Sequence, residues 1–129
     1  MGQRNCILVV DDDATIVAMM TERLRHAGYV VSEAADGPAA VIQAEALKPK
    51  LIIADIQMPP WSSGVEALAE IRKARGMKDV PVIFLTGMPP DEARKLVPPD
   101  PRVCLMSKPV DWIMLEQAIE QLIGETKTL

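Results

Sequence analysis

The run Ile7-Leu8-Val9-Val10, which leads directly into Asp11-Asp12-Asp13, decides the fold of this chain. Short continuous apolar runs of this kind are typical of strands that are buried on both faces, as in a parallel sheet. Because ligands of open α/β sheets bind at the carboxyl ends of the strands, the polar residues that follow such runs are candidate site residues. Three other runs end in the same way: Leu51 to Ala54 before Asp55, Val82 to Leu85 before Thr86, and Val103 to Met106 before Ser107 and Lys108.

Between the apolar runs, hydrophobic residues recur at helical spacing. We expect Asp13 to cap a helix that ends at Gly28, and Gly37-Pro38 to begin a helix that Pro49 stops. Further helices are predicted over residues 64–75, 91–97 and 111–123, and a short strand over residues 29–31. The inward helix faces are predicted to carry Val17, Met20, Leu24 and Ala27; Ala40, Ala44 and Leu47; Val65, Leu68 and Ile71; and Trp112, Leu115, Ile119 and Leu122.

The resulting order, a strand followed by a helix five times over, predicts an α/β fold with one doubly wound, five-stranded parallel sheet and helices on both faces. Right-handed crossovers leave few arrangements, of which the flavodoxin-like strand order 2-1-3-4-5 is common. That order places the strands that end in Asp11 and Asp12, Asp55, Thr86 and Lys108 side by side. We expect a single domain over residues 1–129, with its core over about residues 6–123.

The chemistry at that sheet edge indicates phosphoryl transfer. Clustered carboxylates repel one another unless a cation neutralises them, and hard oxygen ligands suit Mg²⁺, which keeps several of its waters. The ammonium of Lys108 and the hydroxyl of Thr86 can bind phosphoryl oxygens. Asp55 follows a strongly apolar run, so its carboxylate is expected to be partly buried, and such burial is costly without a metal or another partner.

Composition and charge narrow the class of protein. The formal net charge is −4 and the chain has no run of Lys or Arg, which argues against a direct nucleic-acid partner. No apolar stretch approaches the roughly 18 residues of a membrane span, and the start resembles no signal peptide, so we expect a cytoplasmic protein with no membrane partner. Cys6 and Cys104 both lie in apolar runs and are expected to be buried, reduced thiols.

Four motifs together resemble the receiver domain of two-component response regulators, over roughly residues 6–122. They are Val9-Val10-Asp11-Asp12, then Asp55-x-x-Met58-Pro59 followed by Gly64, then Thr86-Gly87, and finally Lys108-Pro109. The resemblance implies a stand-alone phosphorelay protein in which Asp55 accepts a phosphoryl group from a histidine kinase or phosphotransfer protein. It implies a phosphoprotein, not a true enzyme, although self-catalysed phosphorylation from small donors and autodephosphorylation are compatible with it.

The resemblance also implies roles for the other site residues. Asp12 and Asp55, with the backbone carbonyl of Gln57, would hold Mg²⁺, and Asp11 would act largely through a bound water. Lys108 would contact a phosphoryl oxygen, and Thr86 would respond to the phosphoryl group. The Lys108-Pro109 peptide bond is expected to be cis, as in the family.

Two other readings stay open on the sequence. Asp11-x-Asp13-x-Thr15 matches the first motif of haloacid-dehalogenase-like phosphatases, in which the first aspartate is the nucleophile, but Asp55 would then have no role. The chain could also be a receiver-like interaction module that is never phosphorylated. Asp13 is interpreted as a helix cap and not as a ligand.

Some features depart from the family pattern. Four residues, 60–63, separate Pro59 from Gly64 where the family usually has three, so a bulged loop is expected beside Asp55. Leu105 stands where most receivers carry an aromatic switch residue, and Val110 replaces the usual aromatic after Lys-Pro. The movable element is therefore expected to be the proline-bounded stretch from Met88 to Pro101. With no output domain recognised, the chain is expected to act on a downstream protein target.

Overall fold

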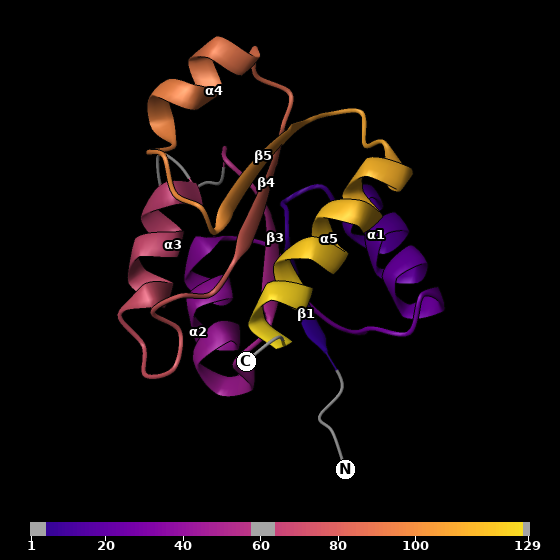
Figure 1. Cartoon of the computed structure of the whole chain (residues 1–129), viewed down its shortest axis with the longest axis vertical. Helices are drawn as coiled ribbons and strands as arrows, with labels where there is room; N and C mark the ends of the chain where they lie inside the picture. Colours follow the sequence, from indigo (N-terminus) through magenta and orange to yellow (C-terminus); the bar gives the residue numbers. More distant parts are fainter. Residues whose placement is uncertain (1–4, 58–63, 128–129) are drawn as a thin grey trace.

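The structure is a computed structural model of the chain, and it describes residues 5–57 and 64–127. Within these residues five strands and five helices alternate, as the sequence predicted (Figure 1). The loop over residues 60–63, predicted to bulge, lies outside the described residues. The elements are β1 (Cys6–Val10), α1 (Ala14–His26), β2 (Val30–Ala34), α2 (Gly37–Leu47), β3 (Leu51–Asp55), α3 (Gly64–Arg72), β4 (Val82–Thr86), α4 (Pro90–Leu96), β5 (Val103–Ser107) and α5 (Trp112–Lys127).

The five strands form one parallel sheet in the order β2-β1-β3-β4-β5, which confirms the predicted flavodoxin-like topology. The register aligns the carboxyl ends of the central strands. Val10 pairs with Ala54, Asp55 with Leu85, and Thr86 with Ser107. The residues that follow the strands therefore meet at one edge of the sheet.

Each face of the sheet has its own hydrophobic core. Successive residues of β1 alternate between the two cores, so that Ile7 and Val9 pack under α1 and α5, while Leu8 and Val10 pack under α2 and α3. Figure 1 shows α1 and α5 together on one side of the sheet and α2, α3 and α4 on the other. Both faces of each central strand are thus covered, which explains why the strands read as continuous apolar runs.

Some local predictions were wrong. Ala27 is the C-cap residue of α1 and is exposed, and Leu47, the last residue of α2, is 49% exposed. α3 ends at Arg72 and not at Arg75, because the chain turns before Gly76, whose φ of +82° favours glycine. α5 extends to Lys127, four residues beyond the predicted end at residue 123.

Cys6 and Cys104 are free thiols but only partly buried, which corrects the prediction that both are buried. Cys6 is the first residue of its strand, and Cys104 lies on β5, which pairs with β4 alone. Partial burial raises the pKa of both thiols. Within the described part of the chain, no helix is both long enough and apolar enough to cross a membrane.

Asp13 caps α1, as the sequence indicated. Its Oδ1 accepts hydrogen bonds from the backbone N–H groups of Thr15, at 2.9 Å, and Ile16, at 3.3 Å. We expect Asp13→Ala to lower the free energy of unfolding by about 1 kcal/mol, because two N–H groups of the first turn lose their acceptor. Asp13→Asn should retain most of that stability. Urea unfolding of the three proteins measures the difference, and equal losses in both variants would contradict the capping role.

Candidate functional site

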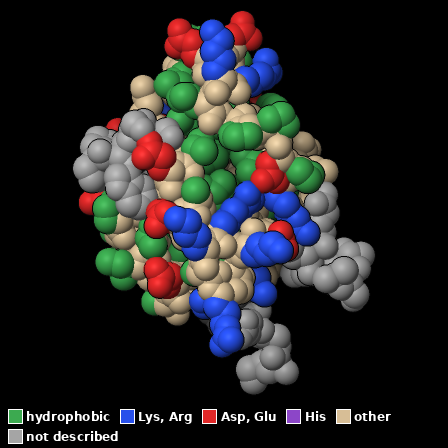
Figure 2. All heavy atoms as spheres, turned by 90° about the vertical axis from the view of Figure 1, so that its left-hand side faces the viewer, with side chains coloured by type: hydrophobic (Ala, Val, Ile, Leu, Met, Phe, Trp, Pro, Cys, Tyr) green, Lys and Arg blue, Asp and Glu red, His purple; other side chains and the backbone are tan. Residues whose placement is uncertain are grey.

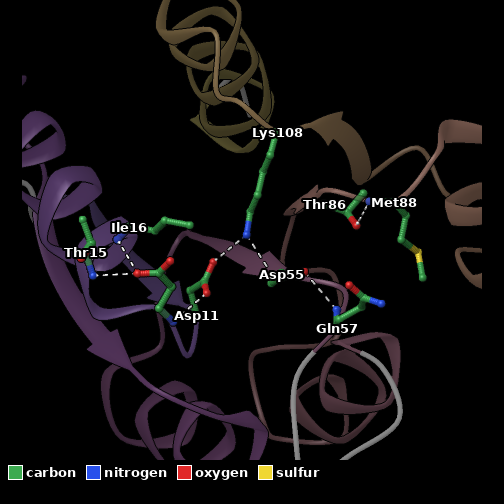
Figure 3. Close-up of polar contacts among 9 residues, drawn as sticks. Asp11, Thr15, Ile16, Asp55, Gln57, Thr86, Met88 and Lys108 are labelled. Atoms are coloured by element: carbon green, nitrogen blue, oxygen red, sulfur yellow. Dashed lines mark hydrogen bonds and ion pairs between the residues drawn. The ribbon is translucent and has the colours of Figure 1, made fainter.

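The side chains predicted to form the site come from four neighbouring strand ends. Asp11 directly follows β1, Asp55 is the last residue of β3, Thr86 is the last residue of β4, and Lys108 directly follows β5. In Figure 3, Lys108 points between Asp11 and Asp55, and Thr86 lies on the far side of Asp55 from Asp11. The parallel register thus gathers residues that are as many as 97 positions apart in the sequence.

Lys108 forms the centre of the site. Its Nζ donates to Asp11 Oδ2 at 3.1 Å and to Asp55 Oδ2 at 2.9 Å. The side chains of Lys108, Asp11 and Asp55 are 21%, 5% and 12% exposed, so this is not a solvated surface charge. Burial alone would lower the pKa of Lys108, but the hydrogen bonds and charges of Asp55 and Asp11 outweigh burial and raise it above its usual value.

The second oxygen of each carboxylate is held by the backbone. Asp11 Oδ1 accepts from the N–H of Asp13 at 2.9 Å, and Asp55 Oδ1 accepts from the N–H of Gln57 at 3.0 Å. In each carboxylate, one oxygen therefore accepts a hydrogen bond from the backbone N–H two residues further along the chain, and the other accepts one from Lys108. This arrangement fixes the orientation of both groups and directs their Oδ2 atoms toward the same point.

Thr86 is buried, and it accepts hydrogen bonds from the segment that follows β4 and from the segment that follows β5. Its Oγ1 accepts a hydrogen bond from the N–H of Met88 at 3.0 Å, at the start of the chain segment that leads to α4. Its carbonyl accepts from the N–H of Lys108 at 2.8 Å. The Lys108-Pro109 bond is cis, which confirms the prediction. Thr86 is thus bonded both to the lysine that contacts Asp55 and to the chain that follows β4.

The predicted metal ligands are only partly brought together. Asp12 is exposed, and in the described part of the chain it forms no hydrogen bond or ion pair, while Asp11, expected to act through water, is buried against Lys108. No group of three His, Cys, Asp or Glu side chains among the described residues is placed to hold a metal ion. The donor chemistry nevertheless fits Mg²⁺, because Asp11, Asp12 and Asp55 supply hard carboxylate oxygens at neighbouring strand ends and this hydrated ion needs few protein ligands.

One polar contact outside the site was not predictable from the sequence. Arg72 at the end of α3 donates to Asp100, which lies in the segment between α4 and β5, at 2.7 Å. Because the two residues are 28 positions apart, neither periodicity nor a local motif indicates the pair. Only the strand order, which places β4 between β3 and β5, brings these segments together.

A doubly wound sheet whose carboxyl edge carries two aspartates, a buried threonine and a lysine that contacts both carboxylates has the architecture of a receiver domain. Residues 7–120 match the model of the response regulator receiver domain. The chain therefore belongs to the response regulator receiver domain family. This membership leaves the haloacid-dehalogenase-like alternative, with Asp11 as the nucleophile, without support.

Curated relatives place the chain among two-component proteins. It is 39% identical over 80 residues to the alkaline phosphatase synthesis transcriptional regulatory protein PhoP of Bacillus subtilis, covering 62% of this chain and 32% of that protein. It is 41% identical over 81 residues to the transcriptional regulatory protein PdtaR of Mycobacterium tuberculosis, covering 62% and 38%. The matched region thus spans about a third of the length of these relatives.

Solved structures agree with the fold. The chemotaxis response regulator CheY4 of Vibrio cholerae superposes with a TM-score of 0.80 at 28% identity, covering 93% of this chain and 99% of that chain. The receiver domain of the sensor histidine kinase PA1611 from Pseudomonas aeruginosa gives 0.81 at 29% identity, covering 95% and 99%. That structure has a magnesium ion coordinated in its active site cleft.

Proposed function

We propose that this receiver domain accepts one phosphoryl group on Asp55 from a histidine kinase or a phosphotransfer protein, with Mg²⁺ as cofactor, and thereby switches a protein-interaction surface. The observation that carries the proposal is the position of Asp55. Its carboxylate lies at the carboxyl end of a central strand, 12% exposed, with the Lys108 ammonium 2.9 Å from its Oδ2. This combination provides a reachable nucleophile beside a fixed positive charge.

The proposed reaction is the transfer of a phosphoryl group from a phosphohistidine nitrogen to a carboxylate oxygen of Asp55. The oxygen–phosphorus bond forms as the nitrogen–phosphorus bond breaks, and the imidazole leaves with the electron pair, giving an acyl phosphate. Phosphoryl transfer depends mostly on positioning and on neutralising charge on the equatorial oxygens. Lys108 supplies one such charge, and the backbone N–H of Gln57 holds the Oδ1 of Asp55 in place.

Mg²⁺ would be held by Asp12 and Asp55, with the backbone carbonyl of Gln57, while Asp11 would act largely through a bound water. When bound, the ion would neutralise negative charge shared by the carboxylates and the incoming phosphoryl group. Asp11 would in addition keep the Lys108 ammonium next to Asp55, since Nζ contacts both carboxylates. The known magnesium-bound receiver structure from Pseudomonas aeruginosa supports this choice of ion.

The output is proposed to pass through the segment that follows Thr86. Its hydroxyl is bonded to the N–H of Met88, so a phosphoryl group that attracts the hydroxyl would disturb the start of this segment. α4 is short and buries only Ala93, which leaves it few contacts that oppose movement. We propose that the changed surface is read by a downstream protein in the cytoplasm, with no direct contact to nucleic acid and no membrane partner.

The dependence on Mg²⁺ tests the cofactor assignment. With acetyl phosphate as the donor, we expect intact-mass measurement to show one added phosphoryl group when Mg²⁺ is present and almost none when EDTA is present. The reason is that clustered carboxylates repel the phosphoryl anion unless a cation neutralises them. Equal labelling with and without the ion would contradict the metal assignment, and no labelling under either condition would favour the interaction module that is not phosphorylated.

A further inference from the structure

A cleft of about 150 Å³ lies between α3 and the segment that joins α4 to β5, and it contains none of the phosphoacceptor-site residues. Figure 2 shows hydrophobic side chains at the surface below α4, bordered on the lower side by a band of Lys and Arg side chains. We call this feature the α3–α4 cleft. It is lined mainly by apolar side chains from three elements and a loop: Val65, Leu68 and Ala69 of α3, Phe84 of β4, Val97, Pro98 and Pro99 after α4, and Val103 of β5.

The cleft follows from the sequence of the α4 region. Prolines confine α4 to the seven residues Pro90–Leu96, and the chain leaves it in an extended conformation at Val97. A helix this short buries only Ala93 and leaves Leu96 41% exposed. Part of the apolar surface of α3 and the sheet is therefore left partly exposed, as the intermediate burial of Val65 and Val97 shows.

Arg72 and Asp100 lie at one end of the cleft, and the charge of Arg102 also acts on Asp100. Arg72 donates to Asp100 Oδ2 at 2.7 Å and to the Val80 carbonyl at 3.1 Å, and the backbone N–H of Arg102 donates to Asp100 Oδ1 at 2.8 Å. The hydrogen bond from Arg72, followed by that from the Arg102 N–H, lowers the pKa of Asp100, and the charges of both arginines add to this effect. The Asp100 carboxylate thus lies near the charges of two arginines, but only Arg72 bonds to it through its guanidinium.

The two guanidinium groups also have hydrogen-bonding capacity left over. Arg72 Nε and Arg102 Nη1 are buried and meet no acceptor within the described part of the chain. Buried donors without an acceptor are uncommon, and each costs free energy that an additional acceptor would recover. The Arg72 and Asp100 side chains are 23% and 28% exposed, so a second molecule in the cleft can contact them.

We propose that the α3–α4 cleft binds a peptide segment of a protein partner in which an apolar side chain stands next to carboxylates. A volume of about 150 Å³ accommodates a group the size of a benzene ring, so the apolar anchor is a single Leu or Phe side chain. The neighbouring carboxylates would pair with Arg72 and Arg102. A basic segment would meet the two guanidinium groups with like charge, and an acidic segment without an anchor would leave the cleft unfilled.

The test uses the full ¹⁵N-labelled chain carrying Asp55→Asn, so that the outcome does not depend on phosphorylation. The probes are acetyl-Glu-Leu-Asp-Phe-Glu-amide, its basic counterpart with Lys at the acidic positions, and its counterpart with Ala at the apolar positions. We expect only the first peptide to shift the amide resonances of Ala69, Val97 and Asp100 in a saturable way. Shifts caused equally by the basic or the Ala peptide, or no shifts at these amides, would overturn the proposal.

Matched variants then test the charge. Ala69 lines the cleft but is exposed, so it can be replaced without loss of core packing. We expect Ala69→Glu to weaken binding of the acidic peptide at least about threefold, and Ala69→Lys, which has a similar size, to leave it equal or tighter. Arg94→Gln, on the exposed surface of α4, is the control and should change nothing. Equal weakening by Ala69→Glu and Ala69→Lys would refute the role of charge in the cleft.

Discussion

Asp55→Asn is expected to reduce phosphoryl incorporation from acetyl phosphate to background. The amide of Asn is a poor nucleophile toward phosphorus, so no acyl phosphate can form at this position. The substitution keeps the size of the side chain and leaves an oxygen that can accept from the backbone N–H of Gln57. Intact-mass measurement after incubation with acetyl phosphate and Mg²⁺ gives the result directly, as the fraction of chains that carry one phosphoryl group.

Two further variants make this result specific. Asp91→Asn changes a carboxylate that is 94% exposed on α4, and labelling should stay at the level of the parent. Asp11→Asn removes a contact of Lys108 and should slow labelling without abolishing it. Labelling of Asp55→Asn at the level of the parent would exclude Asp55 as the acceptor. Labelling that disappears only in Asp11→Asn would revive Asp11 as the nucleophile.

The topology was predictable because the central strands are buried on both faces. A residue such as Val9 contacts one hydrophobic core while Val10 contacts the other, so no polar residue is tolerated until the strand ends. This requirement produces both the continuous apolar runs and the polar residues after them. The same physical constraint therefore indicated the sheet and the gathering of Asp11, Asp55 and Lys108 at its edge.

Helix ends and partial burial were less predictable, because they depend on how far each element extends past the sheet. Leu47 has helical spacing with Ala44, yet it lies at the last turn of α2 and is half exposed. Cys104 lies in an apolar run, yet its strand pairs on one side only. Local periodicity does not indicate where a helix reaches past the sheet or whether a strand has a neighbour on both sides, because tertiary packing sets both.

The direct ion pairs of Lys108 were also not predicted from the sequence. The resemblance implied that Lys108 contacts a phosphoryl oxygen and that Asp11 acts through a bound water. In the structure, the Lys108 ammonium forms ion pairs with Asp11 and Asp55. A motif identifies which residues meet at an edge, but it does not fix which contacts they form. Those contacts depend on side-chain length and on the two backbone N–H groups that orient the carboxylates.

Lys108→Met is expected to lower the free energy of unfolding by about 3 to 5 kcal/mol at neutral pH. Methionine keeps a similar length and apolar character but removes the ammonium, which leaves the carboxylates of Asp11 and Asp55 mostly buried and facing each other. Removing one partner of a buried ion pair is costly because the remaining charge is uncompensated. Urea unfolding measures the loss, provided that the unfolding free energy of both proteins falls with the same slope against urea concentration.

The dependence on pH follows from the raised pKa of Lys108. Because the folded state holds this proton more tightly than the unfolded state, the stabilising contribution is complete below the unfolded value of 10.5 and is lost as pH rises through the higher folded value. The stability difference between the parent and Lys108→Met should therefore be constant around neutral pH and narrow only in the alkaline range. A difference that already narrows between pH 6 and pH 8 would indicate that another group titrates.

Restoring neutrality provides the decisive control for this prediction. In the triple variant Asp11→Asn, Asp55→Asn, Lys108→Met, no charge of the cluster is left without a partner, so most of the lost stability should return. Both Asn side chains can still accept from the backbone N–H groups of Asp13 and Gln57. A loss below about 1 kcal/mol in Lys108→Met alone would instead class the contact with exposed ion pairs, which contribute little. Recovery in the triple variant after a large single loss would establish that Lys108 stabilises the fold by neutralising the two carboxylates of the proposed phosphoacceptor site.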